Sequence, residues 1–158
     1  MTPEERQDLI NQIKNLPPKL ETAMLGLSDE QLDTPYREDG WTVRQVVHHL
    51  VDSHMNAMIR MKLIMTENDP ILRPYIQDEW AKLPDTNKMP IQTSLSILKG
   101  LHTRWGYLLE NLSEDTWNRK GMHPEDGEVV LKGLLKSYAN HGNNHLKQIT
   151  DLKEKMGW

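Results

Sequence analysis

The sequence of 158 residues contains no cysteine. This absence excludes disulfide bonds, metal sites with thiolate ligands and a cysteine nucleophile. The chain also lacks an apolar stretch of about 18 residues, the length at which a helix can span a membrane, and no apolar run near the N-terminus resembles a signal peptide. We therefore expect a cytoplasmic protein with no membrane partner.

Phenylalanine is absent as well, and hydrophobic residues make up only 37% of the chain, against 27% charged residues. Nine methionines and five tryptophans, together with many leucines, are left to fill the core. The net charge of −4 has no strong asymmetry along the chain, which argues against nucleic acid as the main partner. The length is typical of one domain, so we expect a single domain over residues 1–158.

Four long segments with helical periodicity predict an all-α fold with almost no sheet. The first begins at the capping box Thr2-Pro3-Glu4-Glu5. We expect Pro17-Pro18 to kink or interrupt this helix, because proline has no backbone N–H to donate. Thr42 is a suitable N-cap for the second helix. The predicted long helices cover residues 3–25, 43–65, 91–112 and 131–155.

A long connection joins the second and third predicted helices. Residues 70–90 contain four prolines, and a connection of about twenty residues is long enough to cross the molecule or cover a site. A crossover of this length allows the two helices that it joins to run parallel. Farther along, Pro124-Glu125-Asp126-Gly127 predicts a tight turn between two short extended segments, so we expect a small hairpin there.

Two histidines on the last helix are the strongest candidates for chemistry. His141 and His145 are four residues apart, so they lie on the same helix face and can bind one metal ion. This face is the apolar one, which they share with Leu131, Leu134, Tyr138, Ile149 and Leu152. Buried imidazoles without a partner are costly. Two ligands do not hold a catalytic ion well, so a third is needed from elsewhere in the chain.

The third ligand is sought among the other histidines. His48, His49 and His54 all belong to the second helix, with His54 at the centre of the apolar stripe and the other two just outside its edges. A ligand needs only to face the neighbouring helix, so helix geometry leaves the choice among the three open. We expect His102 to be a partly exposed helix residue and His123 to be a loop residue close to substrate.

The segment from Gly40 to Leu50, GWTVRQVVHHL, resembles the signature of the DinB/YfiT-like superfamily, which has a Trp-Thr or Trp-Ser helix start followed by a His-Leu pair. The His-x-x-x-His helix is similar to the second signature of that superfamily. The similarity also includes Thr34-Pro35-Tyr36-Arg37, Arg73-Pro74-Tyr75 and Met156-Gly157-Trp158. The resemblance is closest to the YfiT subgroup, whose members are described as metal-dependent hydrolases and as bacillithiol S-transferases.

The resemblance implies an up-down-down-up four-helix bundle, usually a homodimer, with one zinc or nickel ion between the helices. The first ligand of the family is the histidine directly before the leucine, which is His49 here, and the other two correspond to His141 and His145. It further implies a metal-dependent enzyme that acts on a small molecule. That enzyme is either a hydrolase or a transferase that uses bacillithiol as a co-substrate, since the chain has no thiol of its own.

Other polar side chains could hold the ligands in place or contact a thiol or electrophile substrate. They are Asp52, Asn56, Tyr138 and Asn144. No residue stands out as a catalytic base. Two other interpretations are a non-catalytic, stress-associated metal-binding bundle, closed by Asp52 or His54 as a fourth ligand, and a plain helical interaction domain. A three-histidine site with an open position favours the enzyme.

Overall fold

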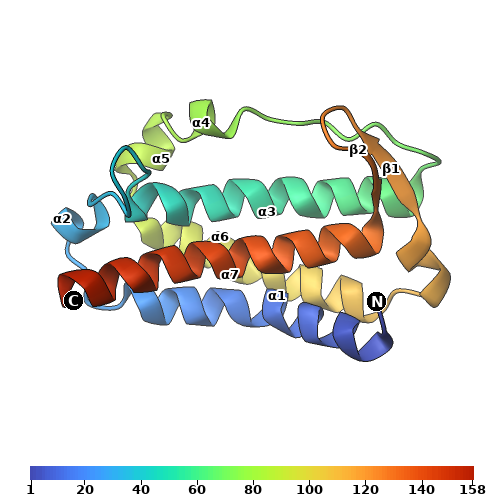
Figure 1. Cartoon of the computed structure of the whole chain (residues 1–158), viewed down its shortest axis with the longest axis horizontal. Coiled ribbons are helices and arrows are strands. Elements are labelled where there is room, and N and C mark those ends of the chain that lie inside the picture. The colour runs from blue at the N-terminus through green and yellow to red at the C-terminus, as the bar shows by residue number, and fades with distance from the viewer.

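Four long helices form a bundle, as the sequence predicted, in the computed structural model, which describes all 158 residues (Figure 1). The long helices are α1 (Pro3–Met24), α3 (Val43–Thr66), α6 (Ile91–Glu110) and α7 (Leu131–Met156). The short elements are α2 (Asp29–Leu32), α4 (Gln77–Trp80), α5 (Pro84–Lys88), the 3-10 helix η1 (Glu114–Asn118), β1 (Lys120–His123) and β2 (Gly127–Val130).

The bundle has the up-down-down-up topology implied by the family resemblance. α1 and α7 run away from the end that carries the hairpin, and α3 and α6 run towards it (Figure 1). Both α1 and α3 pack against α6 and against α7. The crossover, residues 67–90, returns along the outside of α3 and carries α4 and α5 (Figure 1). Gln77 and Asp78 of the crossover line a cavity together with His49 of α3 and His141 of α7, so the crossover covers the side of the bundle on which these two helices meet.

The start of α3 is fixed by a capping box that also holds the crossover. Thr42 Oγ1 accepts a hydrogen bond from the Gln45 backbone N–H at 3.1 Å, and Gln45 Oε1 accepts from the Thr42 N–H at 2.9 Å. The Gln45 amide also donates to the Ala81 carbonyl at 2.9 Å. Next to it, the buried Arg44 donates to Asp33 at 2.6 Å. These contacts attach both the segment before α3 and the crossover to the first turns of α3.

The helix α1 is continuous over Pro3–Met24, so Pro17 and Pro18 do not interrupt it. A proline leaves the carbonyl four residues earlier without its usual donor, and for Pro17 that carbonyl belongs to Ile13. The ring Nδ1 of His102 lies 2.5 Å from the Ile13 oxygen and donates to it instead. The prediction that His102 is partly exposed was therefore wrong: it is 1% exposed and serves a buried carbonyl.

The predicted hairpin is present and holds the crossover at one end of the bundle. β1 and β2 pair antiparallel, with His123 opposite Gly127. His123 is thus the last residue of a strand and is buried, where a loop residue had been predicted. The Leu72 N–H donates to the Met122 carbonyl at 2.8 Å, and the Met122 N–H donates to the Pro70 carbonyl at 2.9 Å. These two hydrogen bonds form an isolated parallel bridge that holds the start of the crossover against β1.

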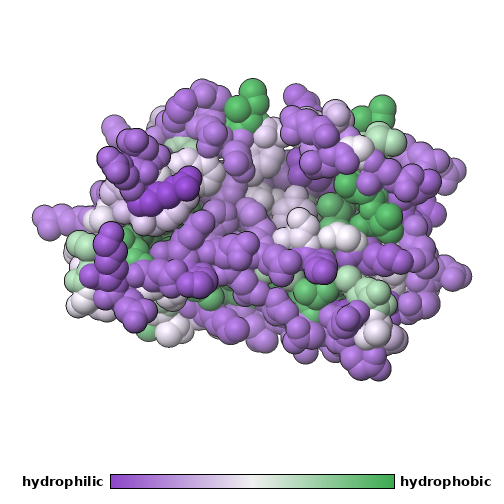
Figure 2. Space-filling model, viewed as in Figure 1, coloured by the Kyte–Doolittle hydropathy of each residue, from purple (hydrophilic) through white to green (hydrophobic).

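The core consists of two hydrophobic clusters with histidines between them. On α3, His54 lies between Val51 of one cluster and Ala57 of the other, and on α6 His102 lies between Leu98 and Trp105 in the same way. The face seen in Figure 2 is mainly hydrophilic, with hydrophobic atoms gathered near the hairpin end. None of the helices is both long and apolar enough to cross a membrane.

We expect Gly142→Ala to destabilise the protein, although alanine favours helices. A Cβ atom at Gly142 on α7 would lie 2.5 Å from Leu16 Cδ2 and 3.4 Å from His54 Cε1, both in the packed core. Overpacking of this kind costs about 1–3 kcal/mol. Gly133→Ala on the same helix is the matched control, since its Cβ meets nothing within 4 Å and should stabilise by up to about 1 kcal/mol. Urea unfolding measures both; equal effects would contradict the packing argument.

Candidate metal centre

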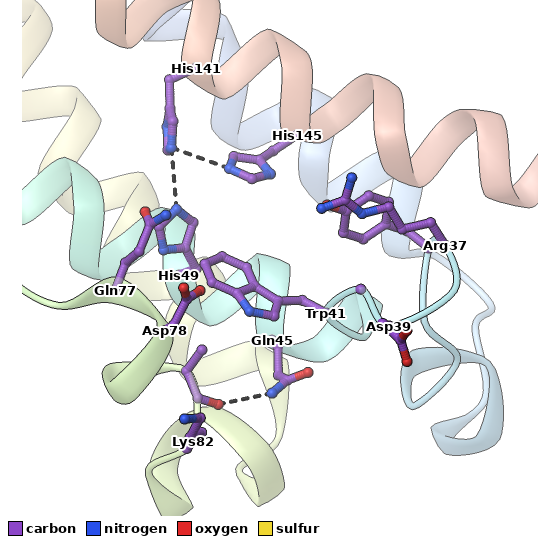
Figure 3. A pocket seen from close by; sticks show the side chains of 13 residues that line it. Arg37, Asp39, Trp41, Gln45, His49, Gln77, Asp78, Lys82, His141 and His145 are labelled. Carbon is purple, nitrogen blue, oxygen red and sulfur yellow. Dashed lines mark hydrogen bonds between the residues drawn. The ribbon is translucent and has the colours of Figure 1, made fainter.

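Three histidines from two helices converge between α3 and α7. His49 lies on α3, and His141 and His145 lie one turn apart on α7 (Figure 3). The Nε2 atom of His141 is 3.2 Å from the Nε2 atoms of both His49 and His145. Each ring thus offers one nitrogen to a common point, and these atoms all lie within 4.8 Å of one another.

The three imidazoles are neutral at pH 7. Burial lowers the pKa of His49 to about 3, with the neighbouring His145 and His141 as lesser causes. Burial also lowers the pKa of His141 to about 4, and it lowers the pKa of His145. A neutral imidazole keeps one unprotonated nitrogen, which is the form that binds a metal ion.

The donor set fits a divalent metal ion. His145 Nδ1 lies 2.8 Å from the acceptor Gln148 Oε1, so it carries the proton and leaves the lone pair on Nε2. His141 Nδ1 is likewise engaged, 3.2 Å from His54 Nε2. Lone pairs 3.2 Å apart repel each other unless a cation lies between them. Two nitrogen ligands of a tetrahedral zinc ion are about 3.3 Å apart, which agrees with this spacing.

The convergent nitrogens line a cavity of about 740 Å³. Its wall includes Trp41, whose ring centroid is 4.6 Å from that of His49 (Figure 3). A second cavity of about 540 Å³ adjoins it, and Gln77, Asp78 and His141 line both. The side chain of His141 is therefore accessible from two cavities.

Of the four residues predicted to support the ligands, Tyr138 lies beside His141. Its hydroxyl accepts a hydrogen bond from Arg60 Nη1 at 2.9 Å, and it lines the second cavity. Asp52 is half-buried, and burial, with the charge of Asp85 as a lesser cause, raises its pKa to about 6. Asp52 lines neither of the two cavities.

The two predicted asparagines also lie outside both cavities. The Asn56 amide donates to the Asp52 backbone carbonyl at 2.8 Å, and Asn144 is exposed. Asn56 lies on α3 and Asn144 lies on α7, the helices that carry the histidines, but neither side chain faces the two cavities. The structure brings only Tyr138 of the four towards the convergent nitrogens.

The structure separates the three histidines of α3. His48 uses both ring nitrogens elsewhere: Nδ1 lies 2.7 Å from Ser94 Oγ on α6, and Nε2 lies 3.0 Å from a backbone carbonyl. His54 is fully buried and contacts the Nδ1 atom of His141, as expected of a hydrogen-bonded core histidine. Among the three, only His49 joins the pair on α7.

Several residues around the histidines were missed from the sequence. They are Arg60, Gln77, Asp78 and Gln148. Gln148 follows His145 by three residues on one helix, a spacing that places side chains next to each other and could have identified it. Gln77 and Asp78 reach this region only through the folding of the crossover over α3. Arg60 lies on α3, and its contact with Tyr138 depends on the packing of α3 against α7. No local pattern predicts these three residues.

The fold and the convergent histidines define a helical-bundle protein with a candidate metal site, and comparison with known proteins gives the family. Residues 12–149 match the DinB superfamily, and the chain belongs to it. Two relatives, from Oceanobacillus iheyensis and Bacillus mycoides, are each 49% identical over 149 residues, which is 94% of this chain and 86% of theirs. Both carry the name "Putative metal-dependent hydrolase".

Solved structures agree with this assignment. YfiT from Bacillus subtilis, described as a probable metal-dependent hydrolase with an unusual four-helix bundle topology, superimposes with a TM-score of 0.98 at 42% identity. The similarity covers 100% of this chain and 91% of YfiT. A mycothiol-dependent maleylpyruvate isomerase shares the fold, with a TM-score of 0.72 at 16% identity over 94% of this chain and 61% of its own.

Proposed function

We propose that His49, His141 and His145 hold one divalent metal ion, zinc or nickel, and that the chain is a metal-dependent hydrolase of a small molecule. The observation that carries the proposal is the convergence of three imidazole nitrogens beside a cavity of about 740 Å³. The names of the relatives support the same conclusion. Three protein ligands leave at least one coordination position open, as in catalytic sites.

The residues around the three histidines orient the proposed ligands and line the cavity through which a substrate would reach them. When bound, such an ion acts as a Lewis acid towards water, a thiol or a carbonyl group. Gln148 fixes the ring of His145, and the ring of Trp41 packs against that of His49 at an interplanar angle of 60°. Arg37 and Lys82 line the same cavity with Asp39 and Asp78 (Figure 3). This polar lining suits a small substrate that carries polar or charged groups.

A second candidate function is transfer of a low-molecular-weight thiol such as bacillithiol to an electrophile. The observation in its favour is that His141 lines two adjoining cavities, which would let two reactants meet at one ion. The non-catalytic alternative would need a fourth protein ligand, but neither Asp52 nor His54 belongs to the group of nitrogens within 4.8 Å. The homodimer implied by the family resemblance stays a prediction.

One set of assays separates the candidates. Zinc-loaded and nickel-loaded protein would be incubated with a panel of esters and amides, and separately with bacillithiol and monochlorobimane. We expect metal-dependent hydrolysis of at least one ester or amide, and no activity in a variant with both His141→Ala and His145→Ala. Bimane conjugation faster than the protein-free control would establish transfer instead. A protein that binds neither metal would overturn both proposals.

A further inference from the structure

A line of hydrogen bonds leads from the core to the proposed ligand His141. The Ile13 carbonyl on α1 is 2.5 Å from His102 Nδ1 on α6. His102 Nε2 is 2.8 Å from His54 Nδ1 on α3, and His54 Nε2 is 3.2 Å from His141 Nδ1 on α7. The Ile13 carbonyl and the three rings are called the histidine chain below. Each of the four long helices contributes one member.

The histidine chain starts at a carbonyl that a proline has freed. In a regular helix the Ile13 oxygen would accept the N–H of residue 17, but Pro17 has none. His102 occupies the position of that missing donor. Pro18 frees the carbonyl of Lys14 in the same way, yet no side chain donates to that oxygen. The carbonyl freed by Pro17 therefore has a side-chain donor, whereas the carbonyl freed by Pro18 has none.

Each link of the histidine chain fixes the position of the next proton. A carbonyl oxygen only accepts, so His102 Nδ1 carries the hydrogen. A neutral imidazole has one N–H, so His102 Nε2 is an acceptor and His54 Nδ1 donates to it. By the same rule, His54 Nε2 accepts from His141 Nδ1. The lone pair of His141 is then on Nε2, the atom that lies 3.2 Å from the Nε2 atoms of His49 and His145.

The surroundings keep the two inner rings neutral. His54 is 0% exposed and His102 is 1% exposed. Trp105 packs edge-on against both, with ring centroids 5.6 and 5.5 Å away, and no carboxylate forms an ion pair with either ring. A charge placed there would be buried without a partner, which is strongly disfavoured. The extra proton that could reverse the direction of the hydrogen bonds is therefore excluded.

We propose that Pro17, His102 and His54 act together as a positioning device that locks His141 in the tautomer with the proton on Nδ1. The inference rests on the proposed function in one respect, that His141 binds a metal ion through Nε2. Metal-binding histidines usually donate their other N–H to an acceptor, which orients the ring and strengthens the ligand. His54 and His102 act through His141 and touch neither metal nor substrate.

Pro17→Ala tests the device while leaving every histidine in place. The new N–H at residue 17 competes with His102 for the Ile13 carbonyl, so we expect affinity for zinc and for nickel to fall about 10-fold. Competition with a chromophoric chelator measures it, and circular dichroism checks the helix content. Pro18→Ala is the matched control and should bind as tightly as the wild type. Equal affinities in Pro17→Ala and the wild type would overturn the proposal.

Nitrogen NMR of metal-free, ¹⁵N-labelled protein reads the tautomers directly. We expect Nδ1 protonated and Nε2 unprotonated in His102, His54 and His141, and a shift of His141 towards the other tautomer in Pro17→Ala. His102→Leu, which removes both donor and acceptor, should lower metal affinity about 10–100-fold, and His102→Gln, which keeps both, should lose less.

A proton on Nε2 of His141 in the wild type would contradict the proposal. The spectra need no metal, so they test the histidine chain separately from the proposed metal-dependent function. Absence of metal binding with the expected tautomers would overturn the proposed function alone, whereas metal binding with the opposite tautomer would overturn the histidine chain alone.

Discussion

We expect His49→Ala to lose the proposed metal binding and hydrolysis, whereas His48→Gln, changed one residue earlier, keeps both. Loss of one of three ligands leaves two, which do not hold a catalytic ion. Even the loss of a residue that only orients a ligand costs about 10–100-fold in affinity, so loss of His49 should cost at least about 100-fold. Metal content per chain after dialysis, measured by mass spectrometry, and chelator competition report the result.

His48→Gln is a demanding control because His48 is also buried and polar. Its ring bonds Ser94 Oγ at 2.7 Å and the Met89 carbonyl at 3.0 Å, and so ties α3 to α6. We expect this variant to lose about 1–2 kcal/mol of stability, since buried hydrogen bonds are disturbed, with metal binding unchanged. Full metal content in His49→Ala, or no bound metal in a folded His48→Gln, would contradict the roles assigned to the two residues.

The metal-free protein should lose stability steeply as the pH falls from 7 to 5. Burial lowers the pKa of His102 to about 4, with the hydrogen bond to the Ile13 carbonyl opposing the shift, and burial also lowers the pKa values of His48 and His54. In the unfolded chain each histidine titrates near pH 6.5. Stability is thus complete above about pH 6.5 and is lost below it, because only the unfolded state takes up the protons.

Part of this loss of stability can be assigned to His102. His102 alone should contribute about 2 kcal/mol between pH 7 and pH 5, given an unfolded pKa near 6.5 and a folded pKa of about 4. Urea unfolding at the two pH values measures it. His102→Gln has no group to titrate and should lose about 2 kcal/mol less over the same interval. The same pH dependence in wild type and variant would contradict the buried, neutral state of His102.

The helices and their order followed from local signals in the sequence. The capping box at Thr42 and the apolar periodicity predicted the helix that begins at Val43, and the predicted last helix starts at Leu131, as observed. The length of the crossover allowed α3 and α6 to run parallel, as they do. Such signals act over a few residues, so they can be read without knowledge of the fold.

The sequence by itself also determined the pair His141 and His145, because a spacing of four residues places two side chains on one helix face. Helix periodicity left the third histidine open and the family resemblance implied His49, whereas the tertiary structure shows which histidine of α3 lies beside the pair. His48, His49 and His54 lie on one helix, and periodicity gives their directions relative to the apolar stripe but not the helix that each direction meets. His48 meets α6, His49 meets α7, and His54 lies behind His141.

The same limit applies to Pro17. Its missing N–H is evident from the sequence and predicts a carbonyl without a donor, but the sequence does not say what replaces that donor. His102 does so from α6, and through it the irregular point of α1 is connected to the proposed ligand on α7. A hydrogen bond between residues distant in sequence depends on how the helices pack, and packing is decided by all four helices at once.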